Sequence, residues 1–188
     1  MGLLNFVSEI EKLKDITRTG WELYSVNNPE SVADHSFCLA VLSMLYAEKL
    51  KLDTEKCIKL ALIHDMCEVY TKDIATRAKE SDQTVNNKEK IYIEKKGMKK
   101  LLSKLPEKLR KEFFSLWQEY NEKTSREALL ISDLDQIEMV LQALEYKRGK
   151  RTSKDLEEFF QTSKPRIETK QGMKLWNNIR KEYLKLKD

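Results

Sequence analysis

Glycine and proline are scarce in this chain, and neither occurs between Pro29 and Gly97. The 188 residues contain 5 Gly and 3 Pro. A β-sandwich or barrel needs a turn about every 8–12 residues, and glycine, proline and asparagine supply most of those turns. The length allows one domain, or two small ones at most. We therefore predict an all-α protein in which residues 1–188 form a single helical bundle.

The charge balance argues against a dedicated nucleic-acid binder. The 35 Lys+Arg and 31 Asp+Glu residues leave a formal net charge of +4, less than such proteins usually carry. No apolar run approaches the roughly 18 residues of a membrane span, so we expect no membrane contact. Cys38, Cys57 and Cys67 lie in apolar helical patterns without CxxC spacing. We interpret them as reduced core residues of a cytoplasmic protein.

Apolar residues at spacings of three and four predict a series of helices. We expect them over residues 3–14, 31–50, 55–70, 88–104, 106–120, 125–149, 155–160 and 168–187. Ser31, with Asp34 three residues later, forms a capping-box-like start for the second of these. The helix over 55–70 is apolar nearly all round and belongs in the middle of a bundle. Residues 15–31 are predicted as an ordered loop, 71–89 as a loop with a short helix, and the last helix is expected to pack on the rest.

Polar residues interrupt the most apolar helices at three places. His35 lies on an apolar helix face, His64 and Asp65 interrupt ALIHDMCEV, and Asp133 and Asp135 interrupt ALLISDLDQIEMVL. A buried charge costs several kcal/mol unless it is paired or bound to a metal. Imidazole and carboxylate together suit Mn, Fe, Co or Zn. The chain has only 2 His, and both fall in these interruptions. A metal site is therefore favoured over two satisfied core histidines.

Glu68 follows His64 by four residues and Asp65 by three, which places all three on one face of a continuous helix. A carboxylate one turn from a metal pair can hold a second ion or act as a general acid or base. The spacing is equally compatible with a surface carboxylate at a helix end. Asp73, just past the predicted helix, has the same two interpretations.

The order of these residues resembles the H…HD…D signature of the HD-domain metal-dependent phosphohydrolases. The resemblance extends over about residues 3–160 in five ordered blocks: RTGW (18–21), PESVADHSF (29–37), HDMCEVYTKDI (64–74), LPEKLRKEFFSLWQEY (105–120) and LDQIEMVLQALEY (134–146). These blocks are similar to the HD-domain 5′-deoxynucleotidases, the YfbR-like and HD-domain-containing-protein-2-like group. The resemblance implies a single HD domain, a homodimer, and hydrolysis of deoxyribonucleoside 5′-monophosphates to deoxynucleoside and phosphate.

The same resemblance implies a role for individual residues. A catalytic divalent cation (Co or Mn, or else Mg, Zn or Fe) would be held by His35, His64, Asp65 and Asp135. Glu68 would be the catalytic acid or base, and Asp73 would contact substrate or join Glu68 at a second ion. Trp21 would pack near the sugar and help exclude a 2′-hydroxyl. Arg18 would orient the phosphate.

Helical spacing and the family pattern disagree about the aspartate on the long helix. Asp133 shares the more apolar face of that helix, so spacing alone nominates it. The resemblance places the ligand at Asp135, which is our prediction. The chain departs from the family at Lys72, where a glycine usually precedes the aspartate, and at Tyr24, where an arginine is frequent. Both departures bear on phosphate recognition.

Two other functions remain open. An HD-domain enzyme acting on a triphosphate, a cyclic nucleotide or an alarmone is one, although no obvious basic cluster lies between Asp65 and Asp73. The other is a non-enzymatic helical interaction module that keeps the metal-site residues for stability. Loss of Glu68 would favour that module, but Glu68 is present.

Overall fold

The computed structural model describes residues 2–186. No strand forms among these residues, and one isolated antiparallel bridge joins Thr17 to Ser31. The all-α prediction is confirmed. The helices are α1 (Gly2–Glu11), η1 (Lys12–Asp15), α2 (Thr19–Leu23), α3 (Val32–Leu50), α4 (Thr54–Ile63), α5 (Glu68–Thr71), η2 (Glu80–Asp82), α6 (Asn87–Leu102), α7 (Glu107–Glu122), α8 (Arg126–Arg148), α9 (Glu157–Ser163), η3 (Lys164–Arg166) and α10 (Lys170–Leu184).

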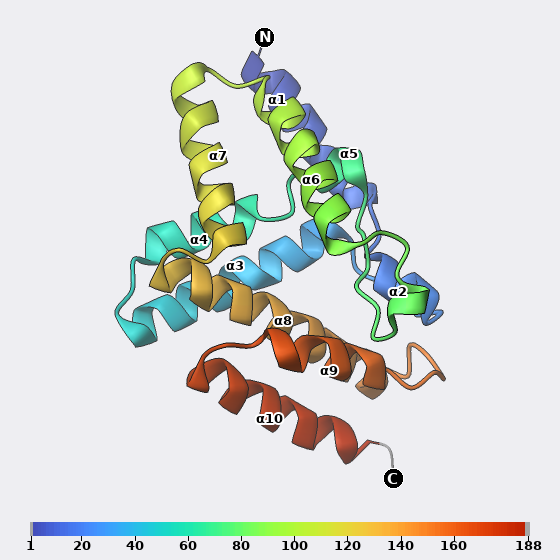
Figure 1. Ribbon diagram of the computed structural model, residues 1–188. Helices are drawn as coiled ribbons and strands as arrows, with labels where there is room; N and C mark the ends of the chain where they lie inside the picture. Colours follow the sequence, from blue (N-terminus) through green and yellow to red (C-terminus); the bar gives the residue numbers. More distant parts are fainter. Residues whose placement is uncertain (1, 187–188) are drawn as a thin grey trace.

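Helices α3 and α8 lie side by side across the middle of the molecule, with α6 and α7 on one side and α9 and α10 on the other (Figure 1). Helix α4 packs against both α3 and α8, and α10 packs against the far side of α8. Helix α8 is buried along most of its length. Within the described part of the chain, no helix has both the length and the apolar composition needed to cross a bilayer.

A capping box starts α3, as the sequence predicts. The Ser31 hydroxyl oxygen accepts the Asp34 backbone N–H at 3.1 Å, and the Asp34 carboxylate accepts the Ser31 backbone N–H at 2.9 Å. These reciprocal bonds satisfy two N–H groups that a helix start leaves without partners. The box fixes the first turn of α3, where His35 lies fully buried.

The predicted continuous helix over 55–70 is wrong, because the chain turns between α4 and α5. Helix α4 ends at Ile63 and α5 begins at Glu68. In the turn the Met66 and Glu68 backbone N–H groups bond to carbonyls three residues back, at Ile63 and Asp65. This tighter bonding changes the helical register, so the simple i to i+4 relation between His64 and Glu68 no longer holds.

Three smaller expectations also need correction. The predicted loop over 15–31 contains the short helix α2, which Trp21 anchors in the core. Cys57 and Cys67 are buried free thiols as predicted, but Cys38 is exposed because it lies on the outward face of α3. The last helix does pack on α8, although it runs from Lys170 to Leu184. Residue 187, the predicted end, lies outside the described residues.

Candidate metal centre and substrate pocket

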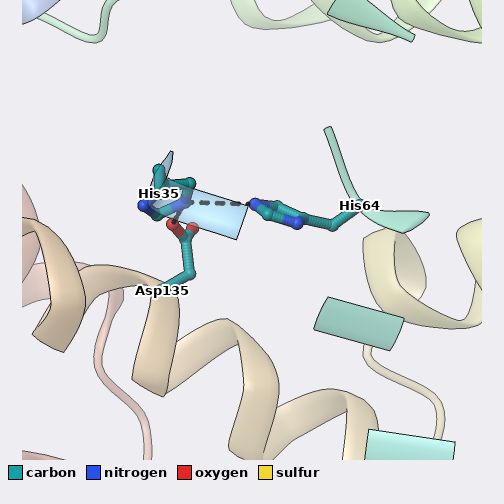
Figure 2. Close-up of side chains that lie close together, drawn as sticks. All are labelled: His35, His64 and Asp135. Atoms are coloured by element: carbon teal, nitrogen blue, oxygen red, sulfur yellow. Dashed lines mark hydrogen bonds and ion pairs between the residues drawn. The ribbon is translucent and has the colours of Figure 1, made fainter. Parts of the chain in front are cut away.

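Four of the predicted ligands converge from three segments. His35 comes from α3, His64 and Asp65 from the turn after α4, and Asp135 from α8. The Nε2 atoms of His35 and His64 are 3.3 Å apart, and Asp135 Oδ1 is 3.2 Å from His35 Nε2 (Figure 2). Asp65 Oδ2 is 3.0 Å from His64 Nε2 and 4.0 Å from His35 Nε2. Ligand atoms of His35, His64 and Asp135 all lie within 4.8 Å of one another.

Hydrogen bonds at the far side of each imidazole direct its Nε2 toward this centre. His35 Nδ1 donates to Glu138 Oε2 at 2.6 Å, and His64 Nδ1 donates to the Ala61 carbonyl at 2.7 Å. When both rings are neutral, each Nε2 therefore carries a lone pair. Two lone pairs that face each other beside Asp65 and Asp135 form a donor set for one cation.

The carboxylates around His35 also favour a positive charge at this centre. Burial and the Arg18 charge lower the pKa of His35, but Glu138 and Asp135 outweigh them and raise it to about 10. Burial alone would raise the pKa of Asp135, yet His35 holds it below its usual range. A proton on His35 or a metal cation can supply the positive charge. The residues present therefore fit a divalent cation.

Among the described residues around this centre, Glu68 is the carboxylate with a buried oxygen that makes no hydrogen bond. Its side chain is 3 % exposed, and Oε2 makes no hydrogen bond within the described residues. Burial, followed by the charges of Asp65 and Asp73, raises its pKa well above the usual value. A buried carboxyl group with a raised pKa holds its proton to a higher pH than a free one does, and a protonated carboxyl group can donate to a reacting group.

A cavity of about 110 Å³ opens beside these residues. Six of the predicted site residues line it, namely Arg18, Trp21, Asp65, Glu68, Asp73 and Asp135. His35 and His64 do not line the cavity and are nearly or fully buried. The structure thus places both histidines behind the cavity wall, with the carboxylates between them and the space for a ligand.

Arg18 and Trp21 reach the cavity from the start of α2. Arg18 Nη1 donates to Asp65 Oδ2 at 3.2 Å, which puts a guanidinium next to a predicted metal ligand. Trp21 is 1 % exposed, stacks on Phe159 with ring centroids 4.0 Å apart, and donates from Nε1 to Glu30 Oε1 at 2.8 Å. Its ring is therefore a rigid wall that leaves little surface for a ligand.

Asp73 holds the loop after α5 against the start of α2. Its Oδ2 accepts the Thr19 backbone N–H at 2.6 Å, and its carbonyl accepts the Thr19 hydroxyl at 2.7 Å. The preceding Lys72 adopts φ 61° and ψ 169°, a region that essentially only glycine adopts without strain. The backbone turn that glycine favours is therefore kept in this chain, with a lysine in its place.

The structure places Asp133 away from the histidines. Its carboxylate is fully buried and accepts the backbone N–H groups of Glu168 and Thr169 at 2.8 and 2.9 Å, just before α10. Those donors account for its burial on the apolar face. Tyr24, the other departure from the family, donates from its hydroxyl to Glu158.

Sequence reasoning missed several residues at this site. Glu138 lies three residues after Asp135 in an apolar helix, so the polar-interruption argument used for Asp135 could have found it. Lys90 and Arg166 line the cavity from α6 and η3. Arg166 donates to the Thr76 hydroxyl at 2.8 Å and Lys90 to the Ile74 carbonyl at 2.9 Å. No local pattern marks either cation, because each reaches the cavity only through the tertiary fold.

Comparison with known proteins agrees with this geometry. The model of the HD domain family matches residues 10–176, so the chain belongs to that family. It is 40 % identical over 162 residues to the 5′-deoxynucleotidase HDDC2 of Mus musculus, covering 86 % of this chain and 78 % of that protein. It is 30 % identical over 156 residues to the 5′-deoxynucleotidase YGK1 of Saccharomyces cerevisiae, covering 83 % and 72 %. A conserved hypothetical protein from Pyrococcus furiosus has a similar structure, with a TM-score of 0.75 and 32 % identity over 95 % of this chain and 99 % of that one.

Proposed function

We propose that this protein is a metal-dependent 5′-deoxynucleotidase, which hydrolyses deoxyribonucleoside 5′-monophosphates to deoxynucleoside and phosphate. The observation that carries the proposal is the convergence of His35, His64 and Asp135 behind a cavity that also holds the unpartnered Glu68. Relatives at 30–40 % identity carry the name 5′-deoxynucleotidase, which supports the same reaction.

The proposed ligands of the divalent cation are His35, His64, Asp65 and Asp135. Nitrogen and oxygen donors in this combination suit Co or Mn, with Mg, Zn or Fe as alternatives. When bound, such a cation polarises a phosphoryl oxygen and lowers the pKa of water. The two Nδ1 hydrogen bonds hold the imidazoles ready for this role before any ligand binds.

Glu68 is the proposed acid or base, and its raised pKa favours the acid. Water adds to phosphorus as the bond between phosphorus and the 5′-oxygen breaks, and the Glu68 proton passes to that leaving oxygen. One of the two protons of the added water then returns to the Glu68 carboxylate, which restores the acid and leaves hydrogen phosphate. General acid catalysis of this kind typically contributes about 10²–10⁴-fold. Arg18 beside Asp65 would orient the phosphate, and Asp73 would contact substrate or join Glu68 at a second ion. The Trp21 ring, held in the cavity wall, would lie near the sugar and help exclude a 2′-hydroxyl.

Phosphate release over a panel of nucleotides tests this function. The metal-free protein is loaded with Mn²⁺ or Co²⁺ and offered each ribo- and deoxyribonucleoside monophosphate, together with a triphosphate and a cyclic nucleotide. We expect orthophosphate from the deoxy monophosphates and at least 100-fold less from a Glu68→Gln variant. Release of pyrophosphate or triphosphate would favour another HD-domain phosphohydrolase. No turnover of any nucleotide would favour an interaction module.

We also propose a cytoplasmic homodimer that does not bind nucleic acid. The homodimer follows from the family resemblance, and α3 exposes Phe37, Val41 and Leu45, which leaves apolar surface for a second copy. The free cysteines support the cytoplasmic location, and the net charge of +4 supports the statement that the protein does not bind nucleic acid. Sedimentation equilibrium measures the oligomeric state directly.

A further inference from the structure

Two buried glutamates lie behind the proposed metal centre. Glu30 and Glu138 are 8 % and 3 % exposed, and one oxygen of each lies within 4.8 Å of the other and of a His35 nitrogen. Carboxylates are costly to bury, so a pair retained in the core calls for an explanation. Neither belongs to the proposed ligand set.

This cluster has the composition of a second metal site, but its geometry is that of a hydrogen bond. Glu138 Oε2 is 2.6 Å from His35 Nδ1, a typical length for a charge-assisted hydrogen bond. Two atoms that bind the same transition ion at about 2.0–2.2 Å each would normally lie about 3 Å or more apart. An ion at Nδ1 and another at Nε2 would also strip both protons from one imidazole. The observed contact therefore fits a proton between Glu138 and His35.

We propose that Glu138 is a positioning residue that sets the tautomer and orientation of His35 for metal binding; this rests on the proposed function. By accepting the Nδ1 proton, Glu138 leaves Nε2 with the lone pair that faces His64 and Asp135. Its negative charge makes that lone pair more basic. Carboxylate partners of this kind typically change metal affinity by about 10–100-fold.

Glu30 provides a matched comparison within the same cluster. It is buried beside the same imidazole, but its Oε1 accepts the Trp21 Nε1 hydrogen at 2.8 Å, and no hydrogen bond joins it to His35 among the described contacts. Glu30→Gln and Glu138→Gln each replace a carboxyl group by an amide of nearly the same shape. Burial raises the pKa of Glu30 to about 7, so the two variants are compared at pH 8, where Glu30 is mostly ionised. Only Glu138→Gln alters the group that accepts the His35 proton.

Calorimetric titration of the metal-free proteins with Mn²⁺ tests the proposal without relying on activity. We expect Glu138→Gln to weaken binding by about 10–100-fold and Glu30→Gln to weaken it far less. Equal affinity of the wild type and Glu138→Gln would overturn the positioning role and leave the proposed function intact. Equal losses of Mn²⁺ affinity in the two variants would also overturn the positioning role, since the loss of a nearby negative charge would then explain both results. A wild type that binds no divalent cation would overturn both.

¹⁵N NMR spectra of the histidine rings supply a second measurement, whose result would not change if Glu138 had only a structural role. With only 2 His in the chain, ¹⁵N-histidine labelling gives signals from two rings, and His64, bonded to the Ala61 carbonyl, is the internal reference. In the Zn²⁺-loaded wild type we expect both rings protonated at Nδ1, with the His35 proton shifted furthest downfield by its carboxylate partner. Glu138→Asp, which keeps the charge but shortens the side chain, should move the His35 signal alone. An unchanged His35 signal would contradict the proposal even if Glu138→Gln failed to fold.

Discussion

Asp133 and Asp135 are two residues apart on α8, yet Asp133 is fully buried whereas Asp135 is half-buried and lines the cavity, and they face different neighbours. Asp133 accepts the backbone N–H groups of Glu168 and Thr169 before α10, whereas Asp135 contacts His35 and accepts the Tyr120 hydroxyl. Both interrupt an apolar helix, and helical periodicity places only Asp133 on the more apolar face. It cannot say which neighbour each one meets, because α3 and the start of α10 are brought to α8 only by the tertiary fold.

Lys72 is a residue whose backbone conformation limits the stability of the protein. A side chain at φ 61° and ψ 169° carries a strain of about 1–3 kcal/mol, which glycine lacks. We expect Lys72→Gly to raise the free energy of unfolding by about 1 kcal/mol, after the greater flexibility of glycine in the unfolded chain is subtracted. Urea denaturation measures this change.

Lys51→Gly is the control for that substitution. Lys51 ends α3 at φ 56° and ψ 45°, in the left-handed region that other residues enter at lower cost. We expect a smaller gain there than at Lys72. A Lys72→Gly protein that is less stable than the wild type would show that the turn is not strained by its side chain.

At the scale of helices, the sequence predicts where a helix begins and which of its faces is buried better than it predicts where a helix is interrupted. The Ser31 and Asp34 pair marks the beginning of α3, and Ser125 marks that of α8, because a capping side chain is a local signal. The turn between α4 and α5 has no such signal. Its residues continue an apolar run, and neither glycine nor proline interrupts it. The turn nevertheless determines where His64, Asp65 and Glu68 lie relative to one another.

The segment between α5 and α6 forms one wall of the cavity and contacts α9 through an ion pair. Arg77 donates from Nε to Glu158 Oε1 at 3.0 Å, and the Ala78 backbone N–H donates to the same oxygen at 2.8 Å. The Arg77 hydrogen bond is the main cause that lowers the pKa of Glu158 to about 2. A lowered pKa in the folded state means that ionised Glu158 stabilises the fold.

The contact between Arg77 and Glu158 predicts that the stability of the fold depends on pH. The stabilisation is complete above about pH 4.5, the unfolded pKa, and is lost as the pH falls through the folded pKa of about 2. We expect Arg77→Gln to lower the free energy of unfolding by about 1–2 kcal/mol at pH 7, a figure reduced for the partial exposure of the pair. The difference from the wild type should narrow between pH 4.5 and pH 2. If denaturant titrations show a constant difference in the free energy of unfolding across this range, Arg77 does not stabilise the fold through Glu158.

At the scale of the whole molecule, the candidate site is where segments distant in the sequence meet. The sequence predicts the all-α class, and polar interruptions of apolar helices identify His35, His64 and Asp65 as candidate ligands, whereas the choice of Asp135 rests on the family resemblance. It does not predict Lys90 and Arg166 in the cavity wall or the separation of Asp133 from the histidines. Those depend on how α6, η3 and α10 pack around α8, which no local pattern specifies.

Because the proposed ligands come from α3, the turn after α4 and α8, a bound cation should stabilise the whole fold. A ligand that binds only the folded state at 100 times its Kd adds about 2.7 kcal/mol to the free energy of unfolding. For a chain of 188 residues, this corresponds to a rise in Tm of about 5–10 °C. We expect Mn²⁺ to produce this rise and a chelator to reverse it. Asp135→Asn, which removes one proposed ligand charge while keeping the shape of the side chain, should largely abolish the rise. An equal rise in wild type and variant, measured by calorimetry, would place the stabilising ion elsewhere on the protein.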